Sequence, residues 1–550
     1  MTAMKTAAAL FLTALCPAAL VALQTGGLPA SLQTRIDAAR SPELRWPNWS
    51  DYRAPVAGFY QRLGGKPAWV AAGAPTPQAR EAMAKLAAAD LKGLNAADYD
   101  GDRWPARVAA LAGGGEAGLE AFDLALTVCL MRYVSDLSVG RINPSKLGQG
   151  FDRTSHKLSL PQFLGDLATA PDPGPRLEGI EPRLLPYRTL LAWLQGYLEL
   201  ARRPTKPLPP VRRLAPGEPY AGAAALAELL VALGDLPAEA AKALPSGSYD
   251  PVLAEAVKRF QARHGLETNA KLGPKTLAQL NTPLSHRVAQ IRLTLERWRW
   301  ASLDPGPRLI EVNLPAFNLS ALSKKGEDYQ TDLWMRVVVG DAFEHETHVL
   351  SAKLAKVVFR PYWNVPRGIV KSDILPQLRK HPKFLAQNGF EIVRWYEAPE
   401  GALPVTPKAI KALAAGTFQL RQKPGPTNAL GRVKLLFPNA HEIYLHDTPT
   451  RNAFESSQRA LSHGCVRVER AAELAAWALR DDPAWPLDKV KAAMEEDAPP
   501  LTVAVPGTVP VLFVYGTATV DGQGHLYFYP DLYNNDAQLQ KALDAGYPYP

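Results

Sequence analysis

Two short segments, Glu442–His446 and Cys465–Val468, most constrain how this chain can fold. In each of them apolar and polar side chains alternate, which is the pattern of a half-buried β-strand. The apolar members of each segment fall on one face and are expected to pack into a core. The polar members fall on the opposite face, and the two segments together predict a cleft lined by Tyr444, His446, Cys465 and Arg467.

The second segment lies in a run that reads Ser-His-Gly-Cys-Val-Arg, residues 462–467. A thiol is a strong nucleophile only as the thiolate, and a nearby imidazole commonly activates it near neutral pH. We therefore expect Cys465 to be a nucleophile and His446 to be its general base. His463 adjoins the nucleophile and is expected to shape the site. Backbone N–H groups near Gly464 and Cys465 would form an oxyanion hole.

Structural roles compete with each of these interpretations. His446 could be a satisfied structural histidine, and Arg467 could make a surface ion pair instead of binding a substrate carboxylate. Clustered His and Cys could also bind zinc, but the CxxC or HExxH spacing of metal sites is missing, so no metal or cofactor is expected. Cys129 lies in an apolar helical run, residues 125–131, and is expected in a core.

This arrangement resembles the active-site signature of the L,D-transpeptidases, a family of bacterial cell-wall enzymes. The shared pattern is a histidine, a spacer of about fifteen residues, then Ser-His-Gly-Cys and a following Arg or Asn. The similarity to the large multidomain members extends over roughly residues 25–540. It includes residues 359–366, 423–434, 437–439 and the His-Asp-Thr-Pro run at 446–449.

The resemblance implies that Cys465 attacks an L,D peptide bond in a peptidoglycan stem peptide, forming a thioester that the amine of a second stem resolves. It implies a transferase of peptidoglycan biosynthesis that carbapenem antibiotics acylate. The residues expected to bind substrate are Arg467, Tyr444, Ser462, Trp363 and Asn364, although Trp363 could equally pack in a core. Hydrolysis, attachment of a protein to the wall, and a non-catalytic wall-binding scaffold are the alternatives.

The chain of 550 residues is longer than one core usually organises, so two to four domains are expected. The predicted fold class is multidomain α+β. A helical scaffold covers residues 25–215, a small three-helix domain covers 216–282, and a mainly β catalytic domain of the L,D-transpeptidase type covers 286–535. A helical, basic insertion at about 367–422 interrupts the β pattern just before the catalytic strands and is expected to act as a lid.

The small domain contains one helix with clear start signals, an N-cap at Asp250 and a proline at position 251. Its segments 260–266 and 273–280 resemble a peptidoglycan-binding domain. The usual Asp-Gly pair of that motif is replaced by Thr268 and Asn269, so a spacer role is the alternative.

Residues 1–22 are expected to be a secretory signal, with Lys5 before an apolar stretch too short to span a bilayer comfortably. The protein is then expected in the periplasm, or on a membrane anchor if this segment is retained. The net charge of +9 is spread along the chain without a basic block, so no nucleic-acid partner is expected.

Overall fold

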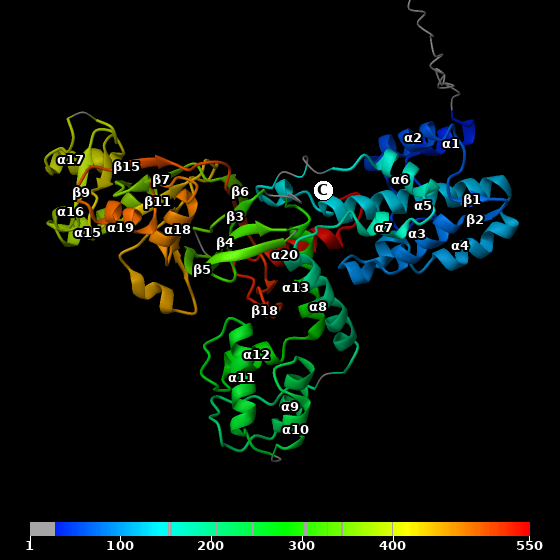
Figure 1. The fold of residues 1–550 in the computed structure, drawn as a ribbon, viewed down its shortest axis with the longest axis horizontal. Helices are drawn as coiled ribbons and strands as arrows, with labels where there is room; N and C mark the ends of the chain where they lie inside the picture. The colour runs from blue at the N-terminus through cyan, green and yellow to red at the C-terminus, as the bar shows by residue number, and fades with distance from the viewer. Residues whose placement is uncertain are drawn as a thin grey trace, which may run out of the picture.

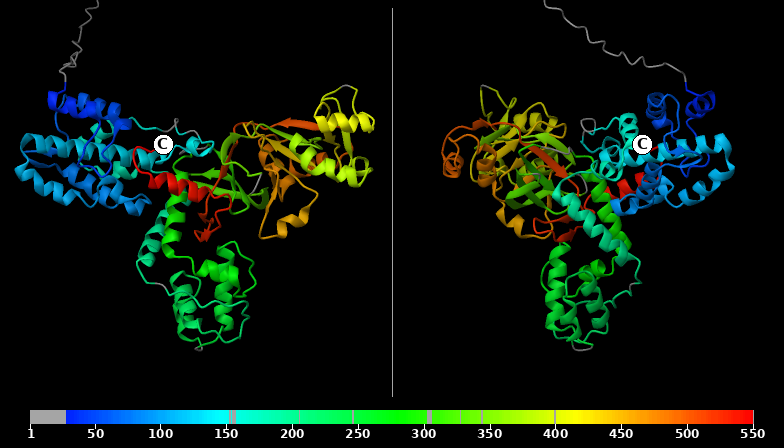
Figure 2. Two further views of the ribbon diagram at one scale, coloured as in Figure 1. Left: turned by 180° about the vertical axis from the view of Figure 1, so that it is seen from behind. Right: turned by 45° about the vertical axis from the view of Figure 1, so that its right-hand side comes forward.

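The computed structural model describes residues 28–549, apart from 152, 154–156, 205, 245–246, 302–305, 327, 343–344 and 399. A helical body and a strand-rich body lie at opposite ends, and a small helical domain hangs below their junction (Figure 1). Two further views show the same arrangement (Figure 2). The predicted multidomain α+β fold class is confirmed. The expected signal segment, residues 1–22, lies outside the described residues.

The helical body surrounds one long helix, α5 (Gly115–Val139), whose side chains are buried along most of its length. A helix that is apolar on all sides must be enclosed by other elements. The buried Asp123 on α5 is satisfied by the Tyr60 hydroxyl at 2.7 Å and by the Trp69 N–H at 2.6 Å. The elements around it are α1 (Ala30–Ala38), α2 (Arg53–Arg62), β1 (Val70–Ala71), β2 (Ala74–Pro75), α3 (Pro77–Ala87), α4 (Trp104–Ala110), α6 (Leu160–Thr169) and α7 (Gly174–Glu178).

The small domain consists of α9 (Ala223–Ala232), the short α10 (Ala238–Lys242), α11 (Pro251–Arg263) and α12 (Pro274–Leu280). The predicted start of α11 is confirmed, because the Asp250 side chain accepts a hydrogen bond from the Val252 N–H at 2.7 Å. These helices share one hydrophobic core with α8 (Leu185–Ala201), α13 (Leu284–Trp298) and the hairpin of β17 (Ala518–Val520) and β18 (Leu526–Phe528). The small domain is therefore packed against the rest of the protein.

An 11-stranded sheet forms the strand-rich body. Its order is β15 (Leu501–Ala504), β7 (Lys356–Phe359), β11 (Val433–Leu436), β12 (Leu445–His446), β14 (Val466–Val468), β5 (Asp328–Gly340), β4 (Asn318–Lys325), β3 (Arg308–Asn313), β16 (Pro510–Val514) and β6 (Leu350–Lys353), with β13 (Ala460–Ser462) pairing beside β5. The strand β16 is inserted between β3 and β6, although it follows them by more than 150 residues.

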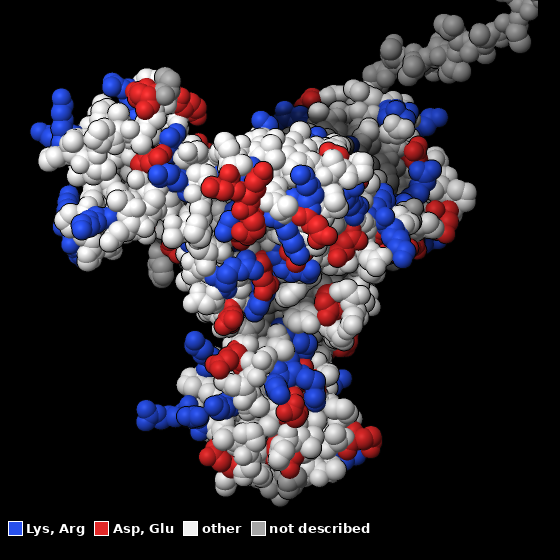
Figure 3. Space-filling view, turned by 60° about the vertical axis from the view of Figure 1, so that its left-hand side comes forward, with Lys and Arg blue, Asp and Glu red and all other residues white. Residues whose placement is uncertain are grey.

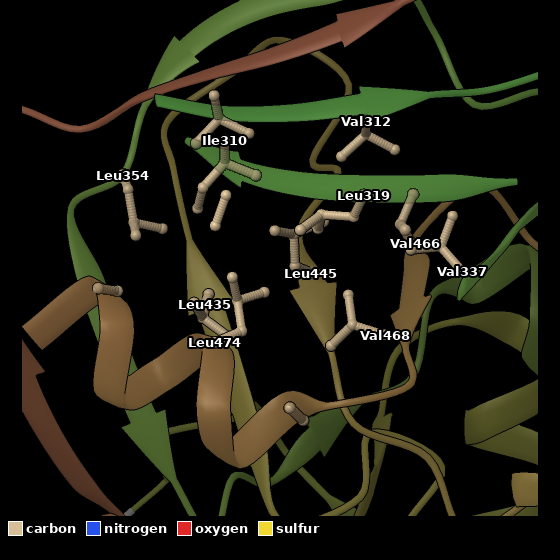
Figure 4. Close-up of a cluster of buried hydrophobic side chains, with 14 of the residues drawn as sticks. Ile310, Val312, Leu319, Val337, Leu354, Leu435, Leu445, Val466, Val468 and Leu474 are labelled. Atoms are coloured by element: carbon tan, nitrogen blue, oxygen red, sulfur yellow. The ribbon is translucent and has the colours of Figure 1, made fainter. Parts of the chain in front are cut away.

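One hydrophobic cluster joins the strands of this sheet to helices α18 (Ala471–Leu479) and α19 (Leu487–Glu495). Side chains from β3, β4 and β5 meet those from β11, β12 and β14 within it (Figure 4). Leu435, Leu445 and Val466 all point into this cluster, so alternation turns their neighbours toward the opposite face.

The insertion has a fold of its own. It contains a three-stranded sheet, in the order β8 (Trp363–Asn364), β10 (Gln419–Gln422) and β9 (Phe390–Val393). Its helical elements are α14 (Arg367–Ile369), the π-helical turn η7 (Val370–Ile374), α15 (Leu375–Lys380), α16 (Phe384–Gln387) and α17 (Pro407–Ala415). These elements enclose a separate hydrophobic core at the outer end of the strand-rich body (Figure 1).

The C-terminal helix α20 (Asn535–Asp544) leads back toward the helical body. There the Tyr547 hydroxyl donates to the Asp136 carboxylate on α5, and the Arg132 guanidinium lies 4.3 Å from the Tyr547 ring. Burial raises the pKa of Asp136 to about 7. Residues close to position 549 thus attach the segment that follows the strand-rich body to the helical body.

Positive and negative side chains are interspersed over the face of the molecule seen in Figure 3. None of the helices in the described part of the chain has the length and apolar character needed to cross a membrane.

We predict that Cys129→Ser lowers the free energy of unfolding by about 1–3 kcal/mol, because it places a hydroxyl in an apolar site. Cys129 is 1% exposed and lies in the core around α5. Thermal unfolding measures the change, and Cys129→Ala, which buries no hydroxyl, is the control. A melting temperature equal to that of the wild type for Cys129→Ser would contradict the assignment to the core.

Candidate active site

Three adjacent strands place a row of polar side chains on the face of the sheet opposite the core. Lys434 on β11 is the register partner of His446 on β12, which is in turn the partner of Arg467 on β14. Tyr444 joins this row, with its ring 5.8 Å from the His446 ring and 5.6 Å from the Lys434 ammonium. The Tyr444 hydroxyl forms a hydrogen bond with Cys465. The structure thus brings together the four residues that the alternation pattern predicted and adds Lys434 to them.

The loop before β14 holds the nucleophile in a fixed turn. The Ser462 hydroxyl donates to the Cys465 carbonyl at 2.5 Å and accepts from the Gly464 N–H at 3.2 Å. The Gly464 carbonyl accepts from the Thr347 hydroxyl at 2.8 Å. Gly464 has a φ of +105°, a backbone conformation that residues with a Cβ atom rarely adopt. The buried Ser462 hydroxyl therefore positions the loop from within the turn.

His446 has one nitrogen engaged and one available. Its Nδ1 lies 2.5 Å from the Asp447 carbonyl oxygen, which can only accept, so Nδ1 carries the proton. The Nε2 atom is then an unprotonated acceptor in the neutral ring. The side chain is 4% exposed, and burial lowers its pKa to about 3. The His446 imidazole is therefore uncharged near pH 7.

The Cys465 thiol is protonated at rest. Burial raises its pKa above the ordinary value, while hydrogen bonds from Tyr444 and the charge of Lys434 act in the opposite direction. Its sulfur lies 3.8 Å from the Glu442 carbonyl oxygen, to which the thiol donates. The thiol and the imidazole are thus both uncharged at rest.

Two cations border this thiol without a carboxylate to neutralise them. Burial lowers the pKa of Lys434 and the pKa of Arg467. In both cases the nearby Cys465 sulfur, as a thiolate, acts in the opposite direction. Within the described residues, neither side chain forms an ion pair. Sequence reasoning missed Lys434 as a site residue. The signal for it was the alternation in Val433–Leu436, where Lys434 faces away from the buried Val433 and Leu435.

His463 faces the insertion. Its Nε2 lies 3.2 Å from an Asp373 carboxylate oxygen on η7, and its ring packs edge-on against His345 with centroids 4.4 Å apart. The Glu442 carboxylate also lies near enough to Tyr396 of the insertion for its charge to help raise the pKa of that phenol, after the larger effect of burial. The insertion therefore lies beside the loop that carries His463 and Cys465.

Trp363 and Asn364 lie on β8 of the insertion. The Trp363 ring packs against the core of the insertion, with its centroid 6.1 Å from that of Phe390. Asn364 is exposed and is the register partner of Arg421. Trp363 therefore packs against the core of the insertion.

Family models match three parts of the chain. The model of the "L,D-transpeptidase catalytic domain" matches residues 307–491, the "Putative peptidoglycan binding domain" matches 221–280, and a "Scaffold domain" matches 54–194. The strand-rich body is an L,D-transpeptidase catalytic domain. It contains the row of Lys434, His446 and Arg467 together with the Cys465 loop, and the small helical domain is the peptidoglycan-binding domain.

A Haemophilus influenzae protein named "Putative L,D-transpeptidase" is 32% identical over 238 residues. The match covers 42% of this chain and 45% of that protein, so the chain spans less than half of the relative's length. A solved Clostridium acetobutylicum structure, named as a fused Zn-dependent amidase/peptidase with a peptidoglycan-binding domain, is 10% identical with a TM-score of 0.16. That match covers 55% of this chain and 99% of the other, and its similarity is too low to bear on the L,D-transpeptidase domain.

The resting state of the pair predicts how alkylation of Cys465 depends on pH. Because the pKa of the thiol is raised, we expect the rate with iodoacetamide to climb through alkaline pH, with an apparent pKa above the ordinary value of about 8.5. Tyr444→Phe removes a hydrogen bond that lowers this pKa, so it should move the curve to still higher pH. Mass spectrometry of the modified peptide measures the rate, with Cys465→Ala as background. A reactive plateau at neutral pH would indicate a resting ion pair instead.

Proposed function

We propose that this protein forms peptidoglycan cross-links as an L,D-transpeptidase. The Cys465 sulfur attacks the carbonyl carbon of an L,D peptide bond in a donor stem, and the terminal D-residue leaves as an amine. The resulting thioester is then attacked by the amine of a second stem, which forms the new amide bond and releases the thiol. The observation that carries this proposal is a thiol in a fixed loop, on the same face of neighbouring strands as a neutral imidazole, within an L,D-transpeptidase domain.

His446 is the general base in this mechanism. Its free Nε2 takes the proton of the thiol during attack and gives it to the leaving amine. In the second half it takes a proton from the acceptor amine and returns it to the sulfur. Its lowered pKa keeps the ring unprotonated at rest, so that Nε2 has a lone pair to offer, and the hydrogen bond from Nδ1–H fixes the orientation of the ring.

Lys434 and Arg467 supply the positive charge of the site. They stabilise the thiolate as it forms, and Arg467 can bind a carboxylate of the stem in a bidentate manner. The Gly464 N–H already donates to Ser462, so we assign the oxyanion-hole role to the Cys465 N–H. This refines the expectation that both N–H groups would serve.

The insertion acts as a lid that favours an amine acceptor over water. The contact between Asp373 of the insertion and His463 supports this role, because a cover beside the Cys465 loop would exclude water and protect the thioester from hydrolysis. A hydrolase would need no such cover, and attachment of a protein would use the same thioester with a lysine as acceptor. Both wall-directed domains act on an extracytoplasmic polymer, which places the protein outside the cytoplasm.

We predict that Cys465→Ala abolishes product formation from purified muropeptides while leaving the fold intact. The thiol is the attacking group, and its removal costs little packing at a partly exposed loop. Mass spectrometry of the products measures activity, and intact mass after carbapenem treatment should show one adduct on the wild type and none on the variant. Cross-linked product from Cys465→Ala would refute the nucleophile assignment.

We predict that Asp373→Ala raises the ratio of hydrolysed to cross-linked product, because it breaks the contact that holds the lid against His463. An exposed ion pair contributes about 0.2–1 kcal/mol, so the ratio should change by less than about fivefold. Glu400→Ala is the matched control, since it breaks an ion pair with Arg394 on the same insertion without touching the active-site loop. If both variants change the ratio equally, the contact with His463 has no special role.

A further inference from the structure

A cleft of about 870 Å³ lies away from the row of Lys434, His446 and Arg467, where three parts of the chain meet. One wall is the outer face of β3, β4 and β5, a second is the hairpin of β17 and β18, and a third is the end of α11 with Gly265 and Leu266. Its volume lies within the range of about 300–1,000 Å³ that is usual for ligand sites.

The sheet wall of this cleft follows from alternation. Ile310, Val312 and Leu319 point into the core (Figure 4), so their neighbours point outward. The outward residues form two rows across the strands. The register pairs Glu311 with Ser320 and Ser320 with Trp334 in one row, and Asn313 with Asn318 and Asn318 with Arg336 in the next.

Aromatic rings border these polar rows. Trp334 is 52% exposed although it lies in the middle of a strand. On the opposite side of the cleft, the rings of Tyr527 and Tyr529 are stacked, 6.4 Å apart and inclined by only 6°. Flat aromatic surfaces beside hydroxyl and amide groups suit a ligand with apolar faces and many polar edges. Sugar rings have this character.

The charged side chains around the cleft are mostly engaged with partners of their own, which favours an uncharged ligand. Arg336 forms an ion pair with Glu469, with its Nε 3.0 Å from the carboxylate. Arg459 donates to the Val337 and Phe317 carbonyls. Asp521 accepts from its own hairpin, through His525 and Tyr527. Among the described residues that line the cleft, both arginines already donate to protein groups, so an anionic ligand such as a free stem peptide would have to displace those bonds.

Glu311 is the exception among these groups. Within the described residues its carboxyl has no hydrogen-bond or ion-pair partner. Burial raises its pKa to about 7, so near neutral pH it is partly protonated and can both donate and accept hydrogen bonds. Such a carboxyl group can form hydrogen bonds with the hydroxyl and acetamide groups of an uncharged saccharide.

The cleft is continuous with the peptidoglycan-binding domain. The Arg263 guanidinium of α11 donates to the Leu526 carbonyl on β18 at 2.9 Å, and His264 stacks on Phe528 with centroids 5.6 Å apart. On its other side, the wall residues Gln458 and Arg459 lead directly into β13 and the Cys465 loop. Seven residues of chain span at most about 25 Å, which limits the distance from Gln458 to the nucleophile.

We propose that this cleft binds the glycan strand of peptidoglycan, as a short segment of N-acetylhexosamine units. The proposal rests on the proposed function, because it identifies the polymer to which the donor stem is attached. Trp334 and the stacked tyrosines pack against the sugar rings, and Glu311 bonds to their polar substituents. The cleft and the peptidoglycan-binding domain together then form one continuous surface for the strand.

Calorimetric titration of the full chain with linear oligomers of β-1,4-linked N-acetylglucosamine, and with glycan strands whose lactyl carboxyl groups are capped as amides, tests this. We expect Trp334→Ala to weaken binding of both probes at least about fivefold, and Glu311→Gln to weaken it as well. Trp395→Ala is the matched control, because Trp395 is 46% exposed but lies on the insertion, and it should bind as the wild type does. Thermal unfolding shows that each variant is folded.

Wild-type affinity in both cleft variants would overturn the proposal, since binding would then belong to the helices of the small domain alone. Displacement of the oligosaccharide by a glycan-free stem peptide, or no binding of either probe, would also overturn it. Turnover of stem peptides by the wild type is measured separately. Its absence would refute the proposed function without changing the result on glycan binding.

Discussion

The register of β11, β12 and β14 is the constraint on which the rest of the site depends. The same three strands contribute Leu435, Leu445 and Val466 to the core and Lys434, His446 and Arg467 to the opposite face. A slip of one residue would exchange the two faces, burying charges and exposing leucines. The hydrophobic core thus fixes which side chains stand beside the thiol. Stability and chemistry are specified by the same alternation.

This coupling also explains the electrostatics of the site. A buried imidazole and a half-buried thiol both favour their uncharged forms, and Lys434 and Arg467 lie nearby with no ion-pair partner among the described residues. Positive charge is therefore in place before negative charge develops on sulfur. In a partly dry site such fixed charges act more strongly than they would in water. The arrangement favours the transition state over the resting thiol.

Local pattern was enough to predict β12 and β14 and the common face on which His446 and Cys465 lie, because both segments alternate visibly. Lys434 was missed because its strand is brought beside His446 by long-range pairing, which no local pattern reveals. The role of Ser462 inside the turn depends on hydrogen bonds with Cys465 and Gly464 that only coordinates show. Trp363 belongs to the packing of the insertion, and its place there depends on contacts with Phe390, which is distant in sequence.

The position of β16 has a consequence for how the protein matures. This strand pairs in parallel with β3 and antiparallel with β6, so it closes the sheet between two strands made much earlier. Pairings of such high sequence separation are slow to form, because a long loop must be ordered first. A chain emerging from the ribosome, or threading through a translocation channel, cannot complete this sheet until residue 514 has been delivered. The sheet that carries Cys465 is therefore completed late in synthesis, long after the strands β3 and β6 have been made.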